Sequence, residues 1–268
     1  MNETPKILLI IGNQRRHLYF ASIIQKAYPL AGVILVERGI DMPSVPDGLE
    51  EIDRHNFEMH FANRRKAEEK HFREIDELKC KILPVDFDKL NTPECVDFVS
   101  GFNPDLAFVF GPGLIKDPLL GVLPSETINT HSGLSPRYRG SATLFWPFYF
   151  LEPNYAGATF HYLQDQPDAG DIIHQVLPKL AYGDKIHDVA CKVIAESATA
   201  ITELIKHYIE RGSWTSYPQK HSGKNFLDSD FHPAQLRLIY NTFNDDIVDH
   251  FLNNKLRSKT PKTIDQFK

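Results

Sequence analysis

Short apolar runs of strand length alternate with segments of helix length along most of the chain, and this alternation strongly limits the possible folds. The run from Lys6 to Ile11 is almost entirely apolar and ends at Gly12, which predicts a strand buried on both faces. A helix is predicted over 17–28, and further strands over 32–36, 80–85, 105–110, 127–131, 158–163 and 172–177. This order of elements predicts an α/β fold of Rossmann-like type, with a mostly parallel sheet and helices on both faces.

Two longer segments have the residue patterns of amphipathic helices. The stretch 49–81 is dense in charge and also contains Phe57, Phe61 and Phe72, which predicts a solvated helix lying on the sheet. Over 186–209, apolar residues recur at helical spacing, and Gly212 then stops the helix.

The pattern changes near residue 211, which predicts a main domain over 1–210 and a small C-terminal extension over 211–268. Pro233 is expected to open a last amphipathic helix in the extension. Its apolar stripe consists of Leu236, Ile239, Phe243, Ile247 and Phe251. A segment this short holds no large core of its own, so we expect the stripe to pack on the main domain or to form a homodimer through the C-terminal region.

Charge and composition exclude several classes of protein. The 268-residue chain has a net charge of −5 and a pI near 6.2, which argues against a protein that binds nucleic-acid backbones. No apolar run approaches the ~20 residues of a membrane span, and the polar N-terminus leads directly into a strand rather than a signal peptide. The three cysteines are too scattered for a disulfide framework or a metal cluster. We therefore expect a cytoplasmic protein without nucleic-acid, membrane or metal partners.

The densest cluster of chemically active residues lies between 128 and 140. Asn129 and His131 are two residues apart at the end of a predicted strand, so their side chains point to the same side. Open α/β sheets bind ligands at the carboxyl ends of their strands, where these two residues are expected. Asp168 follows on a tight loop ahead of another predicted strand.

An amide donor, an imidazole and a carboxylate are the groups that acyl transfer to an amine requires. Donors that are already in place stabilise a developing oxyanion, and the loss of one costs about 10²–10³ in rate. An imidazole with a pKa near ~6.5 accepts the proton that the attacking amine loses. An isolated histidine at a strand end is more often structural, and an isolated aspartate in such a loop usually belongs to a turn, so only the combination points to catalysis.

Four motifs occur in one order along the chain: Asn129-Thr-His131, the run 134–140 with the sequence Leu-Ser-Pro-Arg-Tyr-Arg-Gly, Gly157-Ala-Thr-Phe-His161, and Asp168-Ala-Gly-Asp-Ile-Ile173. In this order they resemble the formyltransferases that use 10-formyltetrahydrofolate, which act on glycinamide ribonucleotide, methionyl-tRNA or amino sugars. The resemblance covers about 80–210 well and the first 40 residues more loosely. It implies an enzyme of the formyltransferase fold with 10-formyltetrahydrofolate as formyl donor.

The resemblance also implies roles for single residues. Asn129 and His131 would stabilise the oxyanion on the formyl carbon, while Asp168 would set the charge state of His131 and hold a proton-relaying water. His161 would support this triad, either as a core histidine under the loop or in direct chemistry.

The run Phe110-Gly111-Pro112-Gly113-Leu114-Ile115 matches the loop whose backbone grips the pteridine ring in this family, although an ordinary strand-to-helix turn has the same composition. The cofactor cleft is also expected to include Asp165, Gly170 and Asp171 from the later loop.

The sequence differs from many members of the family after the histidine, and this difference bears on which amine receives the formyl group. Many members have Pro-Ser-Leu-Leu-Pro after the histidine, whereas this chain has Ser132-Gly-Leu-Ser-Pro136, followed by Phe145-Trp-Pro147, as in members that formylate amino sugars or other small amines. The favoured substrate is an amino sugar linked to a nucleotide, as in lipopolysaccharide O-antigen biosynthesis. Candidate contacts to its phosphates, unless they are solvated loops, are Arg15, Arg16, His17, Arg137, Tyr138 and Arg139.

Other activities stay open at this point. The same triad with water as nucleophile would make a 10-formyltetrahydrofolate hydrolase. Glycinamide ribonucleotide, an amino acid derivative or methionyl-tRNA would be other formyl acceptors, and a ligand-binding protein that has lost catalysis is a further alternative.

Overall fold

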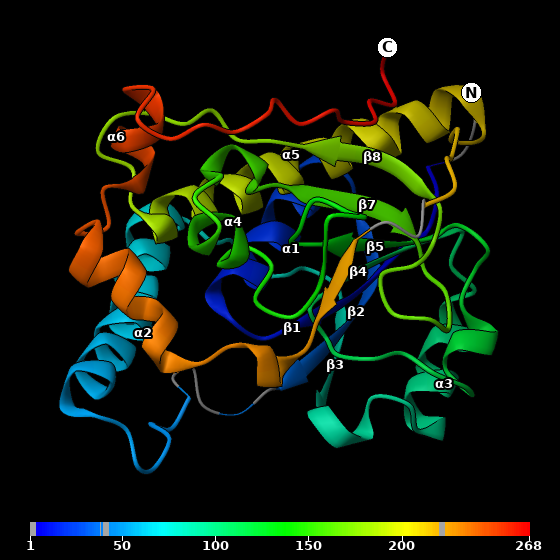
Figure 1. Ribbon diagram of the computed structural model, residues 1–268. Helices are drawn as coiled ribbons and strands as arrows, with labels where there is room; N and C mark the ends of the chain where they lie inside the picture. Colours follow the sequence, from blue (N-terminus) through cyan, green and yellow to red (C-terminus); the bar gives the residue numbers. More distant parts are fainter. Residues whose placement is uncertain (1–3, 38, 40–42, 220–222) are drawn as a thin grey trace.

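A seven-stranded sheet forms the centre of the computed structural model, which describes residues 4–37, 39, 43–219 and 223–268 (Figure 1). The strand order is β3-β2-β1-β4-β5-β7-β8, and the first five strands are parallel. Strand β7 runs antiparallel to β5, and β8 runs antiparallel to β7. The strands are β1 (Ile7–Gly12), β2 (Leu30–Glu37), β3 (Lys81–Asp86), β4 (Leu106–Phe110), β5 (Thr127–His131), β7 (Ala158–Tyr162) and β8 (Ile172–Val176). The predicted α/β fold with a mostly parallel sheet is confirmed.

Helices cover both faces of the sheet, as predicted. Helices α1 (Arg15–Ala27) and α5 (Ile186–Arg211) pack on the face that contains Leu9 and Ile11. Helix α3 (Pro93–Phe102) packs on the other face, against Leu8 and Ile10. Every residue of β1 is therefore buried, which explains why its sequence is apolar without alternation.

Helix α2 (Glu51–His71) lies in a second layer, so the prediction that it lies on the sheet is wrong. The sheet face next to it is already covered by α1 and α5, and α2 packs on α5 instead. On the α5 side, Lys70 and His71 contact Asp188 at 2.8 and 2.7 Å. The helix is also shorter than the predicted segment and ends where the Arg15 Nε–H donates to the Phe72 carbonyl at 2.9 Å.

The predicted terminal helix of the extension is broken into three pieces, a 3₁₀ turn (Pro233–Gln235), a π-helical turn (Leu238–Thr242) and α6 (Ile247–Leu252). Asn244 and Asp245 adopt left-handed backbone conformations with φ of 50° and 56°, and these interrupt a continuous helix. Leu236, Ile239 and Ile247 are nevertheless fully buried, in a cluster with Phe57, Phe145 and Trp146 of the same chain. The main domain thus covers much of the stripe, while the domain boundary and a homodimer stay predictions.

A separate two-stranded sheet joins the C-terminal extension to the rest of the chain. Strand β6 (Tyr138–Gly140) pairs in parallel with β9 (Lys224–Phe226), and α4 (Trp146–Tyr149) follows β6. Near its end the chain runs along the edge strand β8, where the Gln175 N–H donates to the Ile264 carbonyl at 2.9 Å (Figure 1). Further 3₁₀ turns are Phe87–Lys89, Leu120–Val122, Pro153–Tyr155 and Asp228–Asp230.

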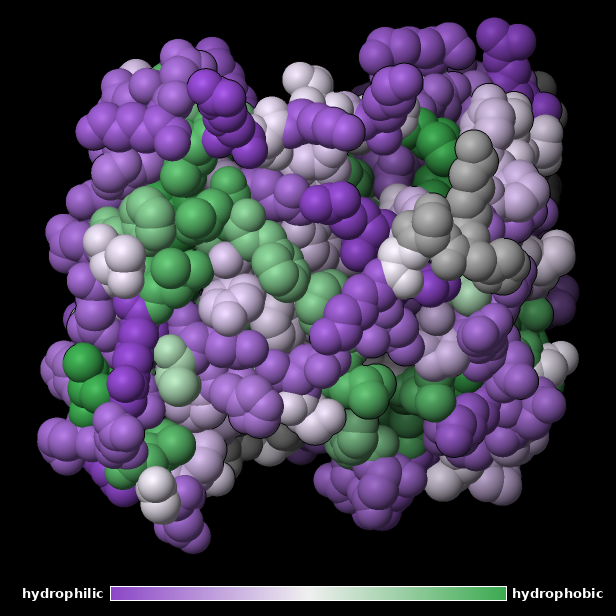
Figure 2. Space-filling model, in the orientation of Figure 1, coloured by the Kyte–Doolittle hydropathy of each residue, from purple (hydrophilic) through white to green (hydrophobic). Residues whose placement is uncertain are grey.

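The surface is mostly hydrophilic on the face shown in Figure 2, with apolar residues gathered over α4. Within the described ranges, no helix combines the length and the apolar character that crossing a membrane requires.

Candidate active site

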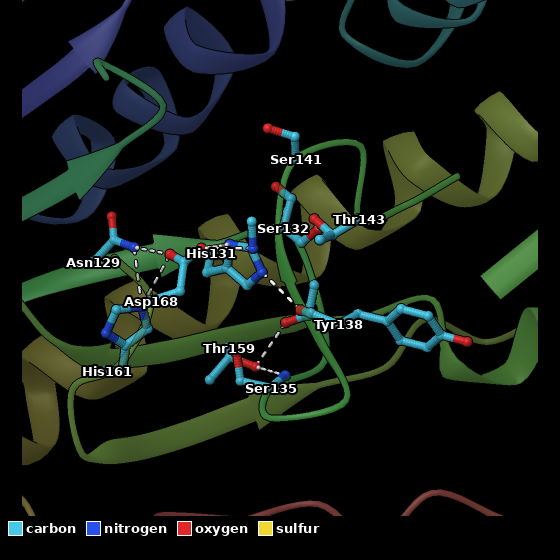
Figure 3. Close-up of polar contacts among 12 residues, drawn as sticks. Asn129, His131, Ser132, Ser135, Tyr138, Ser141, Thr143, Thr159, His161 and Asp168 are labelled. Atoms are coloured by element: carbon cyan, nitrogen blue, oxygen red, sulfur yellow. Dashed lines mark hydrogen bonds and ion pairs between the residues drawn. The ribbon is translucent and has the colours of Figure 1, made fainter. Parts of the chain in front are cut away.

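Asn129, His131 and Asp168 come together at the carboxyl end of β5 (Figure 3). Asn129 and His131 lie on the same side of the strand, and Asp168 reaches them from the loop between β7 and β8. His131 Nδ1 lies 3.3 Å from Asp168 Oδ2, and Asn129 Nδ2 lies 3.4 Å from Asp168 Oδ1. Asp168 has a left-handed backbone with φ of 49°, a conformation that aspartate tolerates better than most residues. The structure thus brings together the three residues that the sequence singled out.

His161 supports this group from β7, where it stands opposite Asn129 in the ladder. Its Nδ1 lies 2.9 Å from the Tyr162 carbonyl oxygen. Since a carbonyl oxygen only accepts, Nδ1 carries the proton and donates it to this bond. In the neutral ring Nε2 is therefore an acceptor, and Asn129 Nδ2 donates to it at 3.0 Å. The His161 side chain is 2% exposed, so it positions the Asn129 amide from inside the protein.

The Asp168 carboxylate is stabilised in its charged form. Burial raises its pKa, but the neighbouring His131 and the Gly140 N–H, which donates to Oδ2 at 3.0 Å, outweigh burial and leave the pKa well below its usual range. Asp168 is consequently ionised at neutral pH.

His131 is arranged to hold a proton on Nδ1. Its Nε2–H donates to the Tyr138 carbonyl at 2.9 Å, which leaves Nδ1 facing the Asp168 carboxylate. Burial lowers the pKa of His131, although the Asp168 charge and the Tyr138 carbonyl act in the opposite direction. In the neutral ring, Nδ1 presents a lone pair to the negative carboxylate. In the protonated ring, the Nδ1–H donates a hydrogen bond to that carboxylate. The pair is therefore suited to take up a proton during a reaction and to release it afterwards.

The turn after β5 is fixed by buried contacts that sequence reasoning missed. Thr159 Oγ1 donates to the Gly133 carbonyl at 2.7 Å and accepts from the Ser135 N–H at 2.9 Å (Figure 3). A Cβ on Gly133 would lie 2.5 Å from His131 Nε2, so only glycine fits beside that ring. Thr159 belongs to one of the four motifs, but nothing in the sequence says which backbone its hydroxyl meets.

Gln219 of the C-terminal extension holds the Asp168 loop. Its Nε2 donates to the carbonyls of Asp168 at 2.8 Å and of Gly170 at 2.7 Å. Gly170 itself is packed so closely that an added Cβ would lie 1.8 Å from the backbone carbonyl oxygen of Tyr162. Sequence reasoning missed Gln219, because it lies in a polar segment far from the motifs.

We expect Gln219→Ala to lower the kcat of the predicted formyl transfer about tenfold, with little change in the KM for the predicted folate donor. Each lost hydrogen bond is worth about 0.5–1.5 kcal/mol, and 1.4 kcal/mol corresponds to about a tenfold change in rate. Steady-state kinetics measure this. The control is Gln25→Ala, which removes bonds to the backbone of Glu77 and Lys79 away from the site and should leave kcat unchanged. A Gln219→Ala variant with native kcat would show that the two hydrogen bonds from Gln219 to the Asp168 loop are dispensable.

A cavity of about 1060 Å³ opens beside the triad. The loop 110–115 lines it together with Asn129, His131, His161 and Asp168, and Gly111 and Gly113 have φ of 67° and 112°. Asp165, Gly170 and Asp171 are not among the described residues that line it. Asp165 is exposed, and Gly170 is buried against Tyr162. Their part in cofactor binding stays a prediction.

The predicted phosphate contacts divide into two groups. Arg16 and His17 line the cavity, and Arg16 is paired with Glu68 at 2.6 Å. Among the described residues, the cavity wall does not include Arg15, Arg137, Tyr138 or Arg139. Arg15 bonds the Phe72 carbonyl, Arg137 forms two bonds to Glu152 at 2.7 and 2.8 Å, and the Tyr138 hydroxyl also meets Glu152. The side chains of Arg15, Arg137 and Tyr138 are thus engaged in structural contacts. Phosphate binding stays a prediction for all six residues.

The described residues contain no group of three or more His, Cys, Asp and Glu side chains arranged to hold a metal ion.

A family model described as formyl transferase matches residues 54–205, more than half of the chain. The chain is similar in structure to a 4-N formyltransferase from Francisella tularensis, with a TM-score of 0.54, 21% identity, and 84% of this chain and 78% of that chain covered. A glycinamide ribonucleotide transformylase from Symbiobacterium toebii gives a TM-score of 0.54 and 18% identity, with 85% and 96% covered.

An N-formyltransferase from Helicobacter canadensis, in complex with folinic acid and dTDP-3-aminofucose, gives a TM-score of 0.52 and 16% identity, with 84% of this chain and 72% of that chain covered. At these identities the structural likeness shows a shared fold.

Proposed function

This chain belongs to the formyl transferase family, and on that premise we propose that it transfers the formyl group of 10-formyltetrahydrofolate to the amino group of a nucleotide-linked amino sugar. The observation that carries the proposal is the meeting of Asn129, His131 and Asp168 at the wall of one large cavity.

The cavity has the features that a folate requires. A flat ring needs close approach to main-chain donors and acceptors, and the glycine-containing loop 110–115 supplies backbone at the wall. Gly113 is closely packed, since an added Cβ would lie 2.5 Å from the Phe87 ring. We assign this loop to the pteridine. When bound, the folate supplies a formyl group that is activated for transfer to an amine.

Asn129 supplies the oxyanion donor. One of its N–H groups bonds His161 at 3.0 Å, while the other reaches Asp168 at 3.4 Å, which is long for a hydrogen bond. The second N–H is therefore the one that an incoming carbonyl oxygen can recruit at little cost. His161 keeps the amide in place while this exchange occurs.

His131 and Asp168 handle the proton. The amine must lose a proton as it forms the new carbon–nitrogen bond, and Nδ1 of His131 can hold that proton against Asp168 Oδ2. The bond between the formyl carbon and the folate nitrogen then breaks, and that nitrogen takes up the proton, so the products are the N-formyl amine and tetrahydrofolate. The Gly140 N–H and Gln219 keep Asp168 aligned throughout.

Two observations support a nucleotide-linked sugar as the acceptor. One fold relative binds folinic acid together with dTDP-3-aminofucose. In addition, the cavity extends beyond the folate loop to the C-terminal extension, which contributes Asn225, Phe226, Leu227, Asp228 and Phe231 to the wall. A glycinamide ribonucleotide transformylase with the same fold makes that ribonucleotide the second candidate acceptor.

The test incubates the enzyme with 10-formyltetrahydrofolate and, in parallel, with nucleotide-linked amino sugars, glycinamide ribonucleotide, methionyl-tRNA or no amine. Mass spectrometry detects the N-formyl product, and absorbance follows the loss of the formyl donor. Product from a nucleotide-linked amino sugar supports the proposal. Product from another amine alone, formate release without any amine, or no turnover at all would each overturn it.

A further inference from the structure

The C-terminal tail, residues 264–268, runs along the outer edge of the sheet beside β8 (Figure 1). The Gln175 N–H donates to the Ile264 carbonyl at 2.9 Å, and the Gln266 N–H donates to His174 Nδ1 at 3.2 Å. Proteins commonly cover the edge strand of a sheet with another segment of the chain. These two bonds are therefore explained by protection of the sheet edge.

A third bond of the tail goes to a side chain inside the protein, and edge protection does not require it. The Ile264 N–H donates to Gln175 Oε1 at 3.1 Å, and Gln175 is only 6% exposed. The same amide donates through Nε2 to the Ser135 carbonyl at 2.7 Å and to Thr159 Oγ1 at 3.1 Å. These partners fix the orientation of the amide, because a carbonyl oxygen only accepts and a backbone N–H only donates. Gln175 thus links the tail, across β7, to the turn that follows β5.

The turn 132–138 holds the ring of His131. Thr159 Oγ1 is bonded to the backbone of this turn on both its donor and its acceptor side. The Tyr138 N–H closes the turn by donating to the Leu134 carbonyl at 3.0 Å. The Tyr138 carbonyl then accepts the proton of His131 Nε2 at 2.9 Å. The position of this carbonyl therefore depends on the shape of the turn.

The Tyr138 carbonyl decides which nitrogen of the neutral His131 ring carries the proton. While Nε2–H bonds that carbonyl, Nδ1 keeps a lone pair 3.3 Å from Asp168 Oδ2. If the carbonyl moves away, the Asp168 carboxylate becomes the better acceptor and the proton shifts to Nδ1. Nδ1 is then occupied before the amine arrives and cannot take up the proton that the amine loses. A displaced turn consequently slows the reaction without any change in the loop 110–115.

We propose that Gln175 is a positioning residue for His131 and that the C-terminal tail holds Gln175 in place. The Ile264 N–H orients the Gln175 amide, the amide fixes the turn, and the turn keeps the His131 proton on Nε2. Neither Gln175 nor Ile264 is among the described residues that line the cavity, so both act through other groups. The effect on rate rests on the proposed function, whereas the place of the His131 proton is a property of the free protein.

Two variants break the link at different points. Gln175→Leu keeps much of the side-chain volume and removes the whole link, and it should lower kcat about tenfold with little change in the KM for folate. Ile264→Pro removes only the backbone N–H of the tail and should lower kcat about two- to fivefold. The double variant should be no slower than Gln175→Leu, because the tail acts through that amide alone. Steady-state kinetics measure all three.

Nuclear magnetic resonance of ¹⁵N-histidine-labelled protein at alkaline pH, without substrates, measures the place of the proton directly. A His131→Gln variant identifies the signals of His131. The native protein should show the proton on Nε2, and both Gln175→Leu and Ile264→Pro should show a population with the proton on Nδ1. A loss of stability alone would not move this proton.

Two matched controls should be native in both measurements. Gln25→Leu removes an equivalent pair of bonds, to the Glu77 carbonyl and the Lys79 N–H, away from the site. Lys262→Pro places the same ring at an exposed position two residues before Ile264. Circular dichroism checks that each variant is folded, and Ile264→Pro decides the question if Gln175→Leu does not fold.

A native His131 signal in the folded variants would overturn the inference. So would an equal change in Lys262→Pro, or losses of rate that multiply in the double variant. If the native protein transfers no formyl group, the proposed function is wrong, while the His131 signal still decides whether Gln175 and the tail position the ring.

Discussion

The Asp168→Asn variant should transfer formyl groups about 10²- to 10⁴-fold more slowly than the native enzyme at saturating folate and amine. Asparagine keeps the size of the side chain and tolerates the left-handed backbone at this position, so the loop can keep its shape. What disappears is the negative charge 3.3 Å from His131 Nδ1, and with it the partner of the proton that the ring takes up. Folate affinity should change little, because the pteridine is assigned to the separate loop 110–115.

Single-turnover formyl transfer measures this effect without interference from product release. Asp97→Asn is the matched control, because Asp97 is exposed on α3. A near-native rate for Asp168→Asn would leave the cluster as a structural turn, and the mechanism proposed for His131 would be wrong.

Replacing Asn129 with alanine should cost about 2.7–4 kcal/mol of transition-state stabilisation, which is about 10²–10³ in kcat. The amide is held by His161 so that one N–H is available to the carbonyl oxygen, and alanine offers no donor. The KM for folate should stay close to native. Rapid-quench kinetics at saturating substrates measure the chemical step.

Two comparisons sharpen this second prediction. Asn253→Ala removes an exposed amide at the end of α6 and should leave the rate unchanged. The double variant of Asn129 and Asp168 should lose far less than the product of the two single losses, because groups that act as one unit are not additive. Strictly multiplicative losses would show that the two side chains act in independent steps.

The sequence predicts the central sheet well because the residue pattern within each of its strands is enough to identify that strand. β1 is apolar at every position since it is buried on both faces, and the spacing of Asn129 and His131 places both side chains at one strand end. The presence of Asp168 beside them follows from resemblance to the family, since spacing alone does not place a loop 37 residues later against β5.

Other features depend on contacts between distant segments and leave no local signal. Gln219 clamps the Asp168 loop from across the chain, and β9 pairs with β6 over only three residues. Helix α2 lies in a second layer because α1 and α5 already cover the face of the sheet next to it. The break in the last predicted helix comes from two left-handed residues, Asn244 and Asp245, within an otherwise amphipathic pattern.

The clamp by Gln219 means that the C-terminal extension is not an interchangeable module. It lines the side of the cavity that we propose for the acceptor and, through the carbonyls of Asp168 and Gly170, also holds the loop of the carboxylate that we propose for the proton transfer. A chimaera that received another enzyme's extension would change acceptor preference and lose rate together. Redesign of the acceptor therefore needs a side-chain N–H donor at position 219, whatever else in the extension is exchanged.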